Sequence, residues 1–137
     1  MVAVSINWWA IIVAALVNMV VGTVWYSKGV FGETWAKLAN MKMSDMGKNA
    51  GVYAYPLVLV GSLVQAYILR HFVVYAGANT ISEGVMTGLW LWLGFVAIAS
   101  GVHAIFEGRP GKLWAINAAY FFMVLAINGA ILATWAS

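Results

Sequence analysis

The side chains best suited to chemistry lie close together, between positions 103 and 109. His103 and Glu107 are four residues apart, so their side chains would meet on one face of a helix, and Arg109 follows Glu107 by two residues. If that helix crosses a membrane, an imidazole beside a carboxylate can transfer protons or bind a cation. In the structural alternative, Glu107 pairs with Arg109, Lys28 or Lys112, and His103 hydrogen-bonds a neighbouring helix. The residues predict a polar or ion site at His103, Glu107 and Arg109 and leave the structural alternative open.

A second set of candidates consists of single polar side chains inside long apolar runs. They are Asn18, Gln65, Ser100, Asn117 and Asn128. If the helices bring them together, they would line a polar path for a solute or ion. The alternative is hydrogen bonding between helices, worth about 0.6 kcal/mol per contact in a membrane. Asn117 and Asn128 are eleven residues apart and therefore share one helix face.

Several kinds of chemistry find no support in the sequence. The chain has no Cys, which excludes disulfides, thiolate catalysis and cysteine metal sites. Its two histidines, His71 and His103, should lie at opposite membrane faces, so we expect no metal site and no cofactor. No phosphate-binding loop, nucleophile elbow or selectivity-filter motif occurs, and an enzyme is the class with least support. The net charge of +3 is too small and too scattered to indicate a nucleic-acid partner.

The composition indicates a membrane protein. Of 137 residues, 64% are hydrophobic and 8% are charged, against about 25% charged in soluble domains. The mean hydropathy is +0.91. Eight Trp and fourteen Gly agree with this class, because Trp collects at membrane interfaces and Gly is frequent in spanning helices. The lipid bilayer is therefore the expected partner.

We predict an all-α polytopic fold, a single domain over residues 1–137 with four transmembrane helices. The spans are expected at about residues 6–26, 50–75, 84–106 and 112–135. Ser44 is a suitable N-cap for the second helix, and Pro56 should kink it. The sequence from Thr80 to Glu83 predicts a capping box before the third helix.

A short amphipathic helix is expected in the interface after the first span, at about residues 30–41. Phe31, Trp35 and Leu38 have the spacing of one helix face, whereas a partly ordered loop is the alternative. The aromatic residues near the ends of the spans are predicted to anchor the protein at the interface. They are Trp25, Tyr26, Phe31, Trp35 and Trp135.

The basic residues predict the orientation in the membrane. Six of the seven lie in the two connections that follow the first and third spans, and only Arg70 lies near the other side. The positive-inside rule then puts residues 27–49 and 107–112 in the cytoplasm and both termini outside it. Arg70, near the far end of its span, should reach the headgroups by snorkelling.

The first and fourth spans carry a weak internal echo. An offset of 110 residues aligns Asn7 with Asn117, Asn18 with Asn128, Trp25 with Trp135 and Ser27 with Ser137. Because the two helices run in opposite directions, the echo has the form of an inverted repeat. Chance similarity is the alternative.

Two longer stretches combine aromatic residues with glycine. Residues 22–35 read GTVWYSKGVFGETW, and residues 88–120 read GLWLWLGFVAIASGVHAIFEGRPGKLWAINAAY. Together they resemble the bacterial domain-of-unknown-function family 1761, over nearly the whole chain from Asn7 to Trp135. A typical member has a His where this chain has Phe121, so no role of that His carries over. The resemblance implies a small integral membrane protein without an established activity.

Two functions remain after these observations. The first is a structural or interaction module that self-associates in the bilayer, because glycine-rich helix faces favour close helix packing and a homo-oligomer. The second is a small-solute or ion channel or transporter, which needs a continuous polar path through the bundle or the oligomer. The sequence leaves any soluble partner open.

Overall fold

The fold was analysed in a computed structural model that describes residues 2–45, 48 and 51–135. In chain order the elements are α1 (Trp8–Trp25), α2 (Gly32–Leu38), η1 (Met43–Asp45), η2 (Gly51–Tyr53), α3 (Ala54–Tyr75), α4 (Ile81–Leu91), η3 (Trp92–Ala97), α5 (Ile98–Phe106) and α6 (Gly111–Thr134). The segments η1 and η2 are short 3₁₀ turns, and η3 is a π-helical segment that joins α4 to α5. The described residues confirm the all-α prediction.

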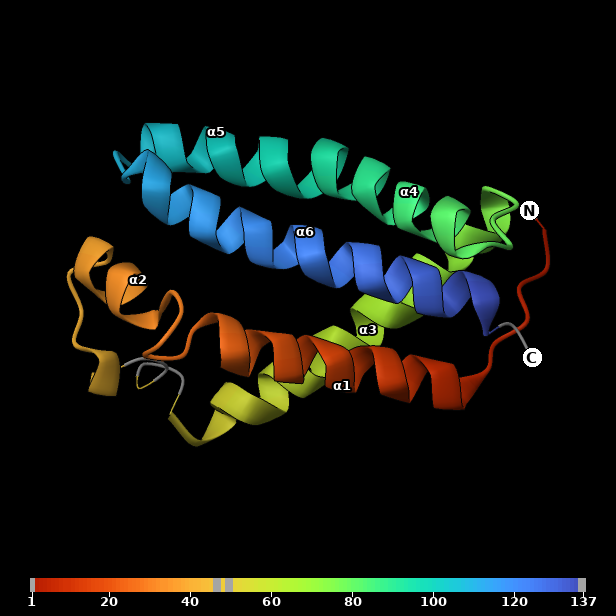
Figure 1. Cartoon of the computed structure of the whole chain (residues 1–137), viewed down its shortest axis with the longest axis horizontal. Coiled ribbons are helices and arrows are strands. Elements are labelled where there is room, and N and C mark those ends of the chain that lie inside the picture. Colours follow the sequence, from red (N-terminus) through yellow and green to blue (C-terminus); the bar gives the residue numbers. More distant parts are fainter. Residues whose placement is uncertain (1, 46–47, 49–50, 136–137) are drawn as a thin grey trace.

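Four helical stretches are long and apolar enough to cross a membrane. They are Trp8–Trp25, Gly51–Tyr75, Ile81–Phe106 and Gly111–Thr134. Successive spans alternate in direction, so the start of α1, the α3–α4 turn and the end of α6 lie at one end of the bundle (Figure 1). The short helix α2 and the α5–α6 turn lie together at the opposite end. These four helices indicate a multi-pass membrane protein.

Helix α6 lies between its neighbours. It packs against α1, α3 and α4, and in Figure 1 it runs between the third span and α1. Its buried side chains include Val124, Asn128 and Leu132. The third span is different, because it packs mainly on α6 and only 6% of its most apolar window is buried, against 39% for α6. One side of the third span therefore faces away from the bundle.

The glycines of α4 explain its close contact with α6. A Cβ atom at Gly84 would collide with the backbone carbonyl of Gly129, and one at Gly88 would collide with the carbonyl of Leu125. A Cβ at Gly129 would in turn meet the carbonyl of Gly84. Small residues that let two backbones touch are typical of membrane helix pairs. These glycines therefore form a helix contact within the chain and do not lie on its outer surface.

The start of the second long helix differs from the prediction, although the span itself, Gly51–Tyr75, lies where it was expected. Helix α3 starts at Ala54 rather than near Ser44, which lies in the short turn η1, and residues 49–50 lie outside the described part. Pro56 is consequently in the first turn of α3, where its missing N–H has no helical partner to lose. The prediction of a helix from Ser44 was wrong, and Pro56 lies near the start of α3 rather than in the helix interior where a kink was expected. By contrast, the capping box of Thr80 and Glu83 is confirmed.

Arg70 also differs from the prediction, because it does not extend away from the protein. Its side chain is buried with 7% of its surface exposed, its Nε donates to the carbonyl of Ser5 at 3.0 Å, and its Nη1 donates to the carbonyl of Leu132 at 2.8 Å. The last carbonyls of a helix lack partners within the helix, and Leu132 is in the last turn of α6. Arg70 therefore joins three parts of the chain at the end of the bundle that carries the termini.

Candidate functional site

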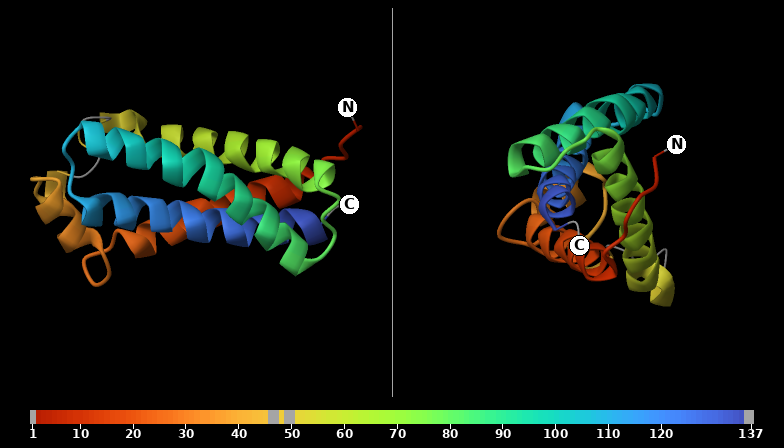
Figure 2. Two further views of the ribbon diagram at one scale, coloured as in Figure 1. Left: turned by 90° about the horizontal axis from the view of Figure 1, so that it is seen from above. Right: turned by 90° about the vertical axis from the view of Figure 1, so that its right-hand side faces the viewer.

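A groove separates α5 from α6 at the end of the bundle that carries the basic connections. Where α4 meets α6, glycines bring the backbones into contact, whereas farther along the indoles of Trp92 and Trp114 lie between the helices. The third span crosses α6 near α4, and from there α5 and α6 diverge toward the turn that joins them (Figure 2). The helices touch where the glycines lie and are held apart where the tryptophans lie, and the groove is at the tryptophan end.

The polar half of this groove has a volume of about 420 Å³. Its lining consists of Ser100, His103, Ala104, Glu107, Arg109, Leu113, Trp114 and Asn117. All three residues of the predicted polar site, His103, Glu107 and Arg109, are in this set. These three residues belong to the wall that α5 and the turn supply, and the other wall comes from α6.

The ionisable residues of the groove pair differently from the first expectation. The Nε of Arg109 lies 2.7 Å from a carboxylate oxygen of Glu107, so the acid forms its ion pair across the turn. His103 is exposed and faces the same groove. The structural alternative for Glu107 is therefore the arrangement observed. Among the residues that the structure describes, no three His, Asp or Glu side chains come close enough to hold a metal ion.

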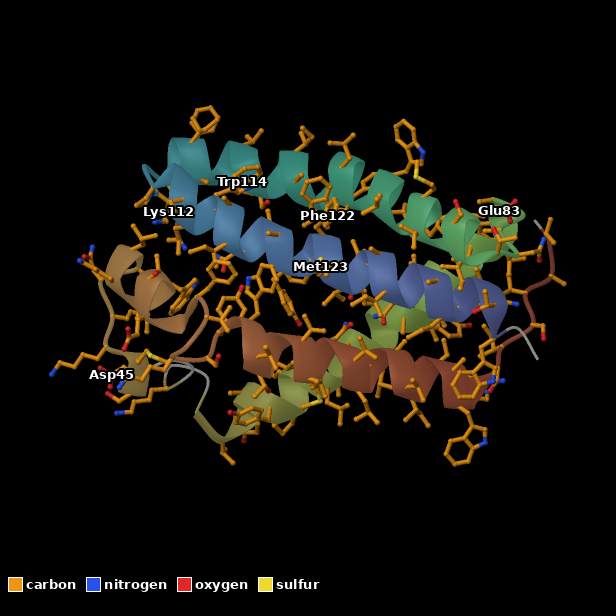
Figure 3. All side chains as sticks on the ribbon, in the orientation of Figure 1. Asp45, Glu83, Lys112, Trp114, Phe122 and Met123 are labelled. Atoms are coloured by element: carbon orange, nitrogen blue, oxygen red, sulfur yellow. The ribbon has the colours of Figure 1, made fainter. Side chains whose placement is uncertain are left out.

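The apolar half of the groove continues from Trp114 toward the middle of the span. This second cavity, of about 230 Å³, is lined by Trp92, Trp114, Ala115, Ala118, Ala119 and Phe122. Trp114 and Phe122 project from α6 toward the third span (Figure 3). The indole of Trp92 donates to the carbonyl of Ala118 at 2.7 Å, and that of Trp114 donates to Ser100 Oγ at 3.0 Å. Both indole N–H groups are satisfied, so this part of the groove presents mainly carbon atoms.

Asn117 connects the groove to the first exit of the chain. Its Oδ1 accepts hydrogen bonds from the hydroxyl of Tyr26 at 2.7 Å and from the indole of Trp35 at 3.0 Å. The indole of Trp25 donates to the carbonyl of Ile116 at 3.0 Å. The hydrogen bond from Trp35 thus holds α2 on α6, and those from Trp25 and Tyr26 hold the end of α1 there.

The predicted interface anchors therefore have a structural use as well. The polar atoms of Trp25, Tyr26 and Trp35 bind α6, and the ring of Phe31 packs on Trp25 with 4.9 Å between centroids. Trp135 is partly exposed at the other end of the bundle. Anchoring in lipid remains a prediction for all five.

A third polar group lies inside the bundle. Asn18 Nδ2 donates to Gln65 Oε1 at 2.9 Å, and Asn128 Nδ2 donates to Asn18 Oδ1 at 2.6 Å. The hydroxyl of Tyr120 donates to the backbone carbonyl of Asn18 at 2.8 Å. Oδ1 of Asn128 is buried and has no hydrogen-bond partner. This amide cluster joins α1, α3 and α6 in the interior.

The five predicted path residues therefore fall into three places. Asn18, Gln65 and Asn128 form the amide cluster, Ser100 binds Trp114 in the groove, and Asn117 binds the α1–α2 corner. The sequence analysis missed Trp92, Trp114 and Tyr120. A signal for the apolar wall was present, since Trp114, Ala118 and Phe122 recur every four residues on one face of α6.

One pair of residues from the internal echo is in contact in the structure. Asn18 and Asn128, which an offset of 110 residues aligns, are hydrogen-bonded to each other across antiparallel helices. The pair Asn7 and Asn117 shows no such likeness, because Asn7 caps the start of α1 whereas Asn117 binds Tyr26 and Trp35. Ser137, the partner of Ser27 in the echo, lies outside the described residues. These contacts do not decide between an inverted repeat and chance similarity.

Comparisons with known proteins identify one family. Nothing among curated proteins or solved structures matches the chain. One family does match, over residues 9–133, and its description is Protein of unknown function (DUF1761). The match covers all four spans and the groove, so the chain belongs to this family of proteins of unknown function.

Proposed function

We propose that this protein is a structural or interaction module of a bacterial inner membrane and that it self-associates in the bilayer through its third span. The observation that carries the proposal is the exposure of that span. Its outer side presents Trp90 and Phe95, with 67% and 74% of their surfaces exposed, around Gly94. A Cβ at Gly94 would meet nothing within 4 Å, so the backbone there is open to a second helix.

The physical reason is the way helices associate in lipid. Apolar side chains alone give little driving force there, since lipid tails are equally apolar, and close packing over small residues is what favours association. The inward glycines Gly84, Gly88 and Gly129 are already used within the chain. Gly94, between bulky aromatic residues, offers a notch that a second copy could fill by a twofold contact.

The arrangement of the polar residues favours this function over a channel or transporter. A conduit needs a continuous polar path. Asn18, with 3% of its surface exposed, is hydrogen-bonded within the amide cluster. Asn117 is hydrogen-bonded elsewhere, to Tyr26 at the end of α1. These bonds join helices to one another, which is what an interaction module requires.

The test compares two exposed glycines. Gly94→Leu fills the notch on the third span, and Gly61→Leu adds the same bulk to α3, where a Cβ also meets nothing within 4 Å. In native mass spectrometry from a mild detergent we expect dimers for the unaltered protein and for Gly61→Leu, and monomers for Gly94→Leu. Only monomer in the unaltered protein, or equal dimer fractions in the two variants, would contradict the proposal.

A further inference from the structure

The α5–α6 groove changes in character along its length. Its end near the turn carries the charged residues Glu107 and Arg109 with His103, and its far end is lined by Ala119, Phe122 and Trp92. Trp114 lines both halves, so the two cavities adjoin. A groove that is charged at the membrane surface and apolar toward the membrane interior has the polarity of a lipid molecule.

We propose that this groove binds one anionic phospholipid per chain, with the phosphate near Arg109 and one acyl chain along the apolar wall. The charges at the polar end favour a negative headgroup. Arg109 is paired with Glu107, and Lys112, which is exposed and does not itself line the groove, adds a positive charge in the first turn of α6. The positive end of the 24-residue helix α6 lies at the same place.

The size and chemistry of the apolar half agree with an acyl chain. The alanines at positions 115, 118 and 119 leave room beside the ring of Trp114 and the packed rings of Trp92 and Phe122. Since both indole N–H groups already donate to protein oxygens, the two rings can contact an acyl chain without leaving an N–H group unpaired. The polar half, of about 420 Å³, has the size of a ligand site, and the apolar half extends it by a smaller cavity of about 230 Å³. This inference is independent of self-association, because the groove lies within one chain.

The experiment measures lipid retention. The purified protein is exchanged with phosphatidylglycerol or phosphatidylcholine in detergent, and bound lipid is counted by native mass spectrometry. We expect one phosphatidylglycerol to be retained per chain, in preference to phosphatidylcholine. Arg109→Gln and Lys112→Gln should each weaken that preference about fivefold, which is the contribution of one basic residue near an anionic surface. Lys37→Gln, which removes an exposed charge from α2, should leave it unchanged.

Blocking variants test the acyl part separately. Ala119→Phe and Ala115→Phe add a ring inside the apolar cavity, and Ala99→Phe adds the same ring on an exposed face of α5 outside it. We expect both cavity variants to lose the retained lipid and Ala99→Phe to keep it, at equal thermal stability. Equal retention of the two lipids by the unaltered protein, or retention unaffected by both cavity variants, would overturn the proposal. Competition by soluble glycerol phosphate as strong as by the whole lipid would also overturn it.

Discussion

At the scale of single residues, Asn18 is the central member of the amide cluster. Its side chain donates to Gln65 and accepts from Asn128, while its backbone carbonyl accepts from Tyr120. Asn128 makes one of these bonds and has a buried oxygen without a partner. The two asparagines therefore differ in what their removal leaves behind.

We expect Asn18→Ala to lower the free energy of unfolding by about 1 kcal/mol more than Asn128→Ala. An unpaired buried polar group costs about 1 to 3 kcal/mol. Asn18→Ala leaves the side-chain amides of Gln65 and Asn128 without their partner. Asn128→Ala leaves only Asn18 Oδ1 without a partner, and it eliminates the oxygen of Asn128 that was unpaired from the start. Equilibrium unfolding in mixed micelles measures both variants. Equal losses, or a larger loss for Asn128→Ala, would show that Asn18 is not the centre of the cluster.

Gly32 decides how the chain turns from α1 into α2. A Cβ there would collide with the carbonyl of Tyr26 and would lie 2.7 Å from the carbonyl of Ser27, neither of which can move aside like a flexible side chain. We expect Gly32→Ala to detach α2 and to speed trypsin cleavage after Lys37. Gly29→Ala is the control, because a Cβ at Gly29 meets nothing within 4 Å. Equal cleavage rates in the two variants would contradict this role of Gly32.

At the scale of elements, the third span joins two kinds of packing on one neighbour. Through α4 it touches α6 backbone to backbone, and through α5 it is held off by Trp92 and Trp114. The π-helical segment Trp92–Ala97 lies between the close-packed part of the span, α4, and the separated part, α5, and such segments are frequent at functional sites. The groove follows from this change in packing.

We expect Gly84→Ala to destabilise the protein by about 2 kcal/mol, because overpacking of a close contact costs about 1 to 3 kcal/mol. Gly61→Ala should be neutral or slightly stabilising, since Ala is the better helix former and the site is open. Thermal unfolding in detergent checks both. A Gly84→Ala variant as stable as Gly61→Ala would mean that α4 and α6 are not in backbone contact.

The sequence predicted those elements that depend on local pattern. Hydropathy located the four spans, and the Thr80 and Glu83 pair located the start of α4. The groove could not be predicted, because it depends on which residues of α6 meet Gly84, Gly88 and Trp92 across long stretches of chain. The start of α3 was missed because Pro56 is compatible both with a kink inside a helix and with a first turn.

At the scale of the whole molecule, the alternating spans bring both termini to one end and the basic connections to the other (Figure 1). Since the chain has no Cys, single introduced thiols report orientation cleanly. We expect an impermeant thiol reagent to label Ser5→Cys in intact cells and Ser44→Cys only after lysis, because both sites are exposed but lie at opposite ends. The reverse pattern would invert the proposed orientation.

Self-association through the third span is the central claim, and thiol cross-linking in native membranes tests it most directly. Phe95→Cys places a thiol on the exposed side of that span, and Leu16→Cys places one on the exposed side of α1. With mild oxidation we predict that Phe95→Cys gives a covalent dimer and Leu16→Cys remains monomeric. No dimer from Phe95→Cys, or equal dimer from both variants, would contradict the claim.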